Sequence, residues 1–206
     1  MSQFTATDFQ RRAEAHLAGS YGGFLDYGDY RANPGMSVID NLNFRDAAVL
    51  VPVVDEPAGA RMILTKRTDS MRKHSGQIAF PGGKLDPDDH DAASAALREA
   101  EEEIGLPRHF VEIVGTLPSF PVPTGFRITP VLSVVRPGFA LKPNPDEVDY
   151  VFDVPLSFLM DPDNYRLGRA QFSGRERNFY EIPYEGHRIW GITAGIIRSI
   201  YERFYE

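Results

Sequence analysis

The sequence predicts a single domain of mixed α and β structure, either α+β or α/β. Its 206 residues, 42% of them hydrophobic, suit one domain that is large enough to bury a core. Short apolar runs bounded by turn residues indicate strands, and segments with apolar residues three and four apart indicate helices. The chain shows no repeats and no low-complexity linker, so these elements are expected to share one fold.

The expected elements follow one another without a break in the pattern. A short amphipathic helix is expected over residues 7–18, where Phe9, Ala13 and Leu17 lie four residues apart. The segment after it is rich in Gly and Tyr and is expected to be irregular. A final helix is expected over residues 193–204, with Trp190 as a core aromatic where it begins. The strand candidates are residues 47–54 and 61–66, which are expected to pair as a hairpin, and residues 77–80, 111–117, 128–135 and 149–155.

Composition and charge exclude several classes of function. The formal net charge of -7 argues against a nucleic-acid backbone as the main partner, because such proteins usually carry a basic surface. With no cysteine, the chain has no disulfide, zinc-thiolate site or catalytic thiol. The first residues lack the apolar core of a signal peptide, and no run approaches the roughly 18 apolar residues of a membrane span. We therefore expect a cytoplasmic protein with neither a nucleic-acid nor a membrane partner.

Four glutamates crowd the last turns of one expected helix, which ends at Gly105. They are Glu99, Glu101, Glu102 and Glu103. Like charges three or four residues apart destabilise a helix by about 0.2 to 0.5 kcal/mol per pair. Acidic residues near the C-terminal end of a helix also oppose its dipole. Some favourable interaction is expected to offset this repulsion.

Helical geometry brings three of these glutamates to one face. Glu99, Glu102 and Glu103 lie beside the apolar stripe, and Glu101 points elsewhere. Three carboxylates at the end of a helix suit Mg²⁺ or Mn²⁺, which take oxygen ligands and commonly bridge to phosphates. A solvated acidic surface is the alternative on this evidence alone. The residues of the expected apolar stripe are Ala93, Leu97, Ala100 and Ile104.

The order of residues around the glutamates resembles the Nudix box of the Nudix hydrolases. That pattern runs Gly, five residues, Glu, seven residues, then Arg-Glu-apolar-x-Glu-Glu-x-Gly-apolar. One departure is visible, because Asp89 stands at the first Glu and eight residues separate it from Arg98. The matching residues are Gly83, Arg98, Glu99, Ala100, Glu102, Glu103, Gly105 and Leu106.

The resemblance implies the Nudix fold, an α/β/α sandwich with a mixed β-sheet, and hydrolysis of a diphosphate that is linked to another group. It implies that Glu99, Glu102 and Glu103 are ligands of Mg²⁺ or Mn²⁺, with the backbone at Gly82 close to the ion. Arg98 would orient a catalytic carboxylate, and Glu102 and Glu103 are catalytic candidates. Glu147 would be a further ligand or the general base, and a loop acid without such a role is the alternative.

A basic segment precedes the box in this otherwise acidic chain. Lys66, Arg67, Arg72, Lys73 and His74 place five cationic groups within nine residues, which suits an additional phosphate. A solvated basic loop is the alternative. The spacing resembles the signature upstream of the box in coenzyme A pyrophosphatases. The matching residues are Leu64, Thr65, Arg67, Arg72, Gly76, Phe80, Pro81, Gly82 and Gly83.

This second resemblance spans roughly residues 45–200 and implies coenzyme A (CoA) or acyl-CoA as the substrate. Arg67, Arg72 and His74 are candidate contacts for the 3'-phosphate of CoA, and Arg127 is another candidate phosphate contact. The expected division of the chain is an N-terminal helix and irregular segment over residues 1–40, followed by a Nudix domain over residues 41–206.

Two other functions remain open on the sequence. A Nudix hydrolase of ADP-ribose or of a dinucleoside polyphosphate is the nearest alternative, and the basic segment disfavours it. A non-catalytic Nudix-fold binding module is disfavoured because all three glutamates of the box are present. The sequence also leaves open whether the protein forms a homodimer.

Overall fold

The structure is a computed structural model that describes residues 3–19, 23, 27–33, 43–69, 76–122, 124–172 and 175–206. Its α-helices are α1 (Ala6–Leu17), α2 (Gly28–Arg31), α3 (Ala92–Ile104), α4 (Leu156–Leu159) and α5 (Ile192–Phe204). Its strands are β1 (Arg45–Val54), β2 (Arg61–Arg67), β3 (Ile78–Ala79), β4 (Gly82–Lys84), β5 (Val111–Thr116), β6 (Phe120–Val122), β7 (Phe126–Val135), β8 (Val148–Pro155), β9 (Arg166–Phe172), β10 (Arg175–Tyr184) and β11 (His187–Trp190). Short 3₁₀ turns lie at Arg108–Phe110 and Pro162–Asn164.

An eight-stranded mixed sheet forms the centre of the fold. β1 and β7 run parallel to each other along their whole length, and the main strand order is β3-β2-β1-β7-β5. The other pairs are antiparallel: β4 pairs with β1, β6 with β7 and β8 with β2. The expected hairpin of β1 and β2 is confirmed by the antiparallel pairs Val53 with Met62 and Val54 with Arg61.

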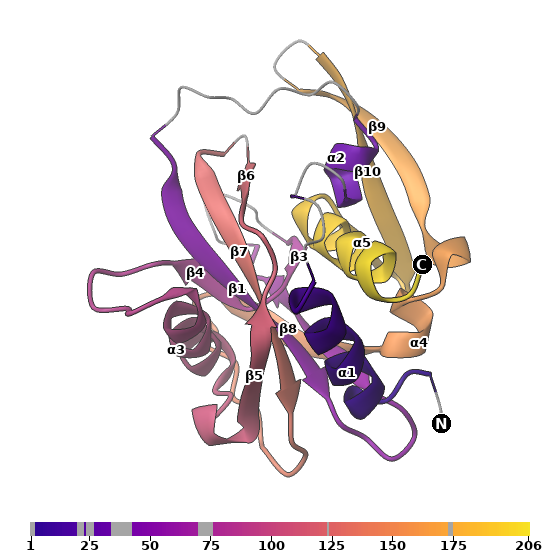
Figure 1. The fold of residues 1–206 in the computed structure, drawn as a ribbon. Coiled ribbons are helices and arrows are strands. Elements are labelled where there is room, and N and C mark those ends of the chain that lie inside the picture. The colour runs from indigo at the N-terminus through magenta and orange to yellow at the C-terminus, as the bar shows by residue number, and fades with distance from the viewer. Residues whose placement is uncertain are drawn as a thin grey trace.

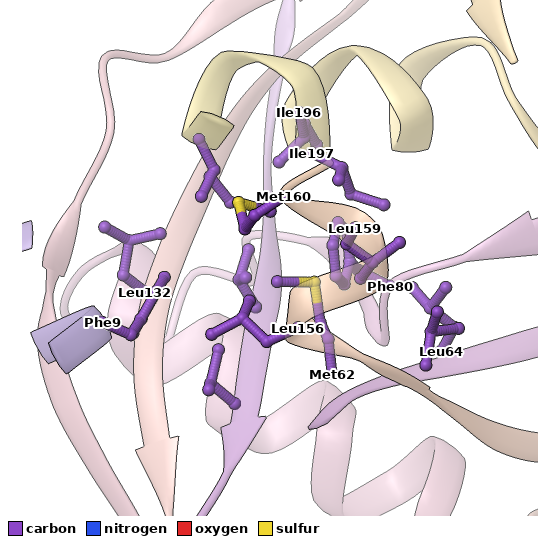
Figure 2. Close-up of a cluster of buried hydrophobic side chains, with 14 of the residues drawn as sticks. Phe9, Met62, Leu64, Phe80, Leu132, Leu156, Leu159, Met160, Ile196 and Ile197 are labelled. Atoms are coloured by element: carbon purple, nitrogen blue, oxygen red, sulfur yellow. The ribbon is translucent and has the colours of Figure 1, made fainter. Parts of the chain in front are cut away.

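Helices cover both faces of this sheet, which confirms the predicted α/β/α sandwich. Figure 1 shows α3 on one side of the sheet and α1 and α5 on the other. Side chains alternate between the faces along a strand, so Leu50 of β1 packs under α3 whereas Val51 packs toward α1 and α5. Figure 2 shows the core on the α5 side, where Ile196 and Ile197 lie near Met160 and Leu159.

The N-terminal helix belongs to the same core as the sheet. α1 begins after Thr5, whose hydroxyl accepts a hydrogen bond from the Asp8 amide. Phe9 and Ala13, two of the residues that define the predicted apolar stripe, are fully buried. The ring of Phe9 packs edge-on against Phe204 of α5, with ring centres 5.9 Å apart. The helix expected over residues 7–18 is therefore confirmed within one residue.

The sequence did not predict the second sheet, an antiparallel arrangement in the order β11-β10-β9. Trp190 is the last residue of β11, and it is half-buried against Phe179 with ring centres 5.7 Å apart. Its expected place in the core at the start of the last helix is therefore wrong. Ile182 and Ile189, on the other face of this sheet, are the residues that enter the core. In the part of the chain that the structure describes, no helix is long and apolar enough to cross a membrane.

Candidate active site

Local interactions fix both ends of α3, the helix that carries the glutamates. At its start, Asp91 and Ser94 form a capping box in which each side chain bonds the backbone of the other residue. Its end is set by Gly105, whose φ of 67° is a left-handed conformation that favours glycine. Ala100 and Ile104 of the predicted stripe are buried, whereas Ala93 and Leu97 are only half-buried. Ala95 and Ala96 are fully buried instead, which turns Glu103 toward the sheet.

Glu103 is buried beside the turn between β3 and β4. The Gly82 amide donates a hydrogen bond to its Oε2 at 3.1 Å, and Arg67 Nη1 lies 3.3 Å from its Oε1. Its side chain is only 3% exposed. Burial raises the pKa of Glu103 to about 7, although the charge of Arg67 and the bond from Gly82 act in the opposite direction. This carboxyl can therefore exchange a proton near neutral pH.

Arg98 connects the acidic face of α3 to the loop before the helix. Its Nη1 contacts Glu99 Oε1 at 3.0 Å and Glu102 Oε2 at 3.1 Å. Its Nη2 donates to the Lys84 carbonyl at 3.0 Å and to Asp89 Oδ2 at 2.9 Å. The hydrogen bonds from Arg98 hold the pKa of Asp89 below its usual value. Arg98 thus positions two carboxylates and the loop at the same time.

Gly83 leaves the space that the Glu99 carboxylate occupies. A Cβ atom at Gly83 would lie 2.4 Å from Glu99 Oε1 and 2.5 Å from its Cδ, closer than real side chains approach. Glu99 is largely buried, with a side chain 17% exposed. Burial raises its pKa, and the charges of Glu102 and Glu147 raise it further against the effect of Arg98. Any side chain at position 83 would collide with the Glu99 carboxylate, so this position requires glycine.

Glu147 reaches the site through the loop that leads into β8. The Asn144 amide bonds the Glu103 carbonyl at 2.9 Å, and the Glu147 amide bonds the Asn144 carbonyl at 3.1 Å. The Glu147 carbonyl accepts a hydrogen bond from the Thr68 amide at 3.0 Å, at the end of β2. The charge of Glu147 raises the pKa of both Glu99 and Glu103. Four carboxylates from two segments therefore share one region of negative potential.

A family comparison agrees with this arrangement, since the NUDIX domain model matches residues 44–172. This chain belongs to the Nudix family. The Nudix hydrolase NudL of Escherichia coli K12, described as uncharacterized, is 41% identical over 161 residues, covering 78% of this chain and 83% of the relative. NudL of Shigella boydii serotype 4 is 40% identical over the same length. The crystal structure of DR0079 from Deinococcus radiodurans shares the fold, with a TM-score of 0.51, 15% identity and coverage of 83% of this chain and 90% of that one.

Membership of the Nudix family makes this chain a hydrolase of a nucleoside diphosphate derivative. Nudix hydrolases generally use divalent ions such as Mg²⁺ or Mn²⁺. The donor set of this Nudix site fits such ions, because it consists of carboxylates whose neighbouring negative charges raise the pKa of Glu99 and of Glu103 and would attract a cation. Within the described ranges, however, no three acidic or histidine side chains stand close enough to enclose an ion as they are. Arg98 lies between Glu99 and Glu102, and Glu102, which is 57% exposed, is free to turn toward an ion.

The structure brings most of the expected site residues together, except that Arg127 lies elsewhere and two further candidates are not described. Arg98, Glu99, Glu102, Glu103, Gly82 and Glu147 lie around one region, and Arg67 joins them by its contact with Glu103. Arg127 instead pairs with Asp46 at 2.7 Å on an exposed part of the sheet. Arg72 and His74 lie outside the described residues. Asp89 was noted in the sequence only as a departure from the family pattern, and its role as partner of Arg98 emerges from the contact between them.

Proposed function

We propose that this chain hydrolyses the diphosphate bond of CoA or its derivatives, giving adenosine 3',5'-bisphosphate and 4'-phosphopantetheine. The observation that carries the proposal is the contact of Arg67 with Glu103 at 3.3 Å. Arg67 begins the basic segment that resembles the coenzyme A pyrophosphatase signature, and Glu103 belongs to the Nudix box. A phosphate bound by the basic segment would therefore lie beside the hydrolytic carboxylates.

Backbone hydrogen bonds support this placement of the basic segment. The Arg67 amide bonds the Gln77 carbonyl at 3.0 Å, and Lys66 pairs with Ile78 between β2 and β3. Arg67 and Gln77, which lie on either side of the residues that are not described, are thereby joined at the start of β3, close to the turn at Gly82. Its central cations, Arg72, Lys73 and His74, belong to the residues that are not described. A loop whose ends are fixed at the site suits recognition of the 3'-phosphate of CoA.

The residues of the chain would act in distinct ways during the reaction. A bound Mg²⁺ or Mn²⁺, held by Glu99, Glu102 and Glu103, would neutralise diphosphate oxygens and make a water molecule more acidic. Arg98 keeps Glu99 and Glu102 in place by its contacts at 3.0 and 3.1 Å. Glu147, which is not among these ligands, is the carboxylate suited to accept the proton of the attacking water, and Glu103 would take that role only if it did not hold the ion. Arg127 would contact a phosphate only after releasing Asp46.

The test compares CoA with dephospho-CoA, which lacks only the 3'-phosphate. A charge-assisted hydrogen bond is worth about 1.5 to 3 kcal/mol, so the specificity constant for CoA is expected to be roughly tenfold to a hundredfold higher. Replacing Arg72 with Ala should narrow this gap, and Arg127→Ala should show whether that exposed cation contributes. Equal specificity constants for the two compounds in the unmutated protein would remove the proposed role of the basic segment. A clear preference for ADP-ribose would support the alternative hydrolase function instead.

A further inference from the structure

A pocket lies on the face of the sheet opposite α3, between α2, α5 and strands β6 and β7. It is a cavity of about 40 Å³ within an open depression whose empty space is about 520 Å³, part of it continuous with solvent. The machinery described above does not use it. Its apolar walls include Leu117, Phe120, Val122, Ile192 and Ile196. A pocket with such walls suits an uncharged chain better than a phosphate.

Two polar side chains that line the pocket can form hydrogen bonds with a ligand. Asp29 of α2 and Arg177 of β10 both line it. Burial raises the pKa of Asp29 to about 6, and the charge of Arg177 acts in the opposite direction. Asp29 Oδ1 also accepts a hydrogen bond from the Tyr180 amide at 3.3 Å. A carboxylate beside a guanidinium offers both an acceptor and donors, which is the pattern that an amide group complements.

The second cation of the pocket is already engaged by the protein. The guanidinium of Arg203 lies 3.7 Å from the centre of the Tyr27 ring, and its Nε is 3.1 Å from Ser199 Oγ. Its Nη1 is 3.0 Å from His16 Nε2. Through these contacts Arg203 holds α1, α5 and Tyr27 together. The polar character that the pocket offers to a ligand therefore comes mainly from Asp29 and Arg177.

The pocket is close to the catalytic turn across the sheet. Pro130 of its wall pairs with Val49 of β1, and Val49 pairs with Gly82 on its other side. Two spacings between neighbouring strands separate Pro130 from Gly82 by about 10 Å. The start of α5 is tied to the same region, because Thr193 Oγ1 donates to the Ile78 carbonyl at 3.0 Å. Arg67 lies on the other side of Gly82, at the end of β2 and next to β3.

We propose that this pocket binds the uncharged, amide-bearing arm of the substrate while the diphosphate lies at the carboxylates of α3. The inference rests on the proposed function, under which the arm is the pantetheine part of CoA. The chain of that arm has as many atoms as the backbone of about four residues, so it extends roughly 13 to 14 Å. This length exceeds the separation of about 10 Å between the turn at Gly82 and the wall of the pocket, so the arm is long enough to enter the pocket. The substrate would thus be recognised on both sides of the bond that is broken.

The first experiment fills the pocket and compares two substrates. Ile192→Trp adds bulk at a half-buried wall residue, and Leu167→Trp, on β9 and 55% exposed, is the matched control. The substrates are CoA and an analogue in which a methyl group replaces the pantetheine arm. The ratio of specificity constants, CoA over the methyl analogue, should fall roughly tenfold or more in Ile192→Trp, as expected for a blocked apolar pocket. The control should keep the ratio of the unmutated protein.

A second variant keeps the shape of the pocket and changes only its polarity. Asp29→Asn preserves an acceptor for the Tyr180 amide, and it should lower the same ratio roughly tenfold by removing the carboxylate that an amide N–H would bond. Isothermal titration with pantetheine, which carries no phosphate, measures the pocket independently of hydrolysis. Binding of pantetheine to the unmutated protein and its loss in Ile192→Trp would support the pocket. If CoA were nevertheless not cleaved, only the proposed function would be overturned. Cleavage of CoA with an unchanged ratio in both variants would overturn the inference.

Discussion

Asp89 accepts two hydrogen bonds from the guanidinium of Arg98, from Nε to Oδ1 at 3.2 Å and from Nη2 to Oδ2 at 2.9 Å. Asp is one methylene shorter than the Glu of the family pattern, and the loop before the helix is one residue longer. The ion pair is nevertheless formed, with the Asp89 side chain only 7% exposed. Arg98 is thereby held where it contacts Glu99 and Glu102.

Removing the charge of Asp89 should loosen Arg98 and the carboxylates that it positions. For Asp89→Asn we expect turnover to fall roughly tenfold and the free energy of unfolding to fall by about 1 to 2 kcal/mol, because the charged hydrogen bonds are lost. Initial rates and urea denaturation measure the two effects. Asp88→Asn makes the same change of charge at the exposed neighbouring residue and should affect neither. Equal behaviour of the two variants would show that the Asp89 pair is incidental.

Glu102 and Glu101 are adjacent on α3, and only one of them faces the site. Glu101 Oε2 instead pairs with Arg108 Nε at 2.8 Å, as expected from its direction on the helix. Glu102→Gln should lower turnover on the order of 100-fold if it is a metal ligand. Glu101→Gln should leave the rate within about twofold of the unmutated protein, because exposed ion pairs contribute little. Circular dichroism should show both variants folded, and a loss of folding in Glu102→Gln alone would assign that residue a structural role.

The raised pKa of Glu103 predicts how the metal-free protein responds to pH. A folded-state pKa of about 7, against 4.5 for the ordinary side chain, means that ionising Glu103 opposes folding. This cost is absent at low pH, grows as pH rises from 4.5 to 7, and is complete above pH 7, with an upper limit of about 3 kcal/mol.

Glu103→Gln should remove this dependence in the presence of EDTA. The unmutated protein should lose more stability than this variant when the pH is raised from 5 to 8. The difference between the two losses in free energy of unfolding should be about 1 to 3 kcal/mol, reduced by the stability that the ion pair of Arg67 with ionised Glu103 contributes in the unmutated protein. Denaturation at the two pH values measures the difference, and Glu101→Gln is the control for charge. A variant that loses as much stability as the unmutated protein between these pH values would contradict the proposed environment of Glu103.

The periodic parts of the fold could be predicted from the sequence, and the short or mixed parts could not. The strands β1, β2 and β7 carry long apolar runs, and Glu99, Glu102 and Glu103 follow the helical period. The second sheet could not be predicted because β9 and β10 mix charged, small and aromatic residues without a continuous apolar run. β4 and β6 have three residues each, so their pairing depends on the longer neighbouring strands.

Contacts between residues that are far apart in the sequence limit how much of the site the sequence can predict. Arg67 and Glu103 are 36 positions apart, and their contact depends on β2 ending beside the C-terminal turn of α3. The sequence therefore predicts Arg67 as a candidate phosphate contact but does not indicate its carboxylate partner. The pocket between α2 and α5 could not be predicted either, because tertiary packing alone places Asp29 and Arg177 in the same pocket.

A single methyl group at Gly83 should disturb the site more than the fold. In Gly83→Ala the new Cβ would overlap the Glu99 carboxylate, which must then move. Turnover is expected to fall at least about tenfold, as for other losses of positioning around a metal site. The melting temperature of the metal-free protein should change little, because the displaced carboxylate is the end of a flexible side chain. Full activity in this variant would mean that Glu99 is not needed at its observed position.

Mass spectrometry of the products formed from CoA with Mg²⁺ or Mn²⁺ tests the proposed hydrolysis of CoA most directly. A panel containing CoA, acetyl-CoA, ADP-ribose and a dinucleoside polyphosphate would be incubated with the unmutated protein and with Glu102→Gln. Adenosine 3',5'-bisphosphate and 4'-phosphopantetheine are expected from CoA. EDTA should abolish their formation, and Glu102→Gln should slow it strongly. Intact CoA beside rapid cleavage of ADP-ribose or of the dinucleoside polyphosphate would contradict the proposed substrate, and cleavage that survives complete chelation would contradict the metal-dependent mechanism.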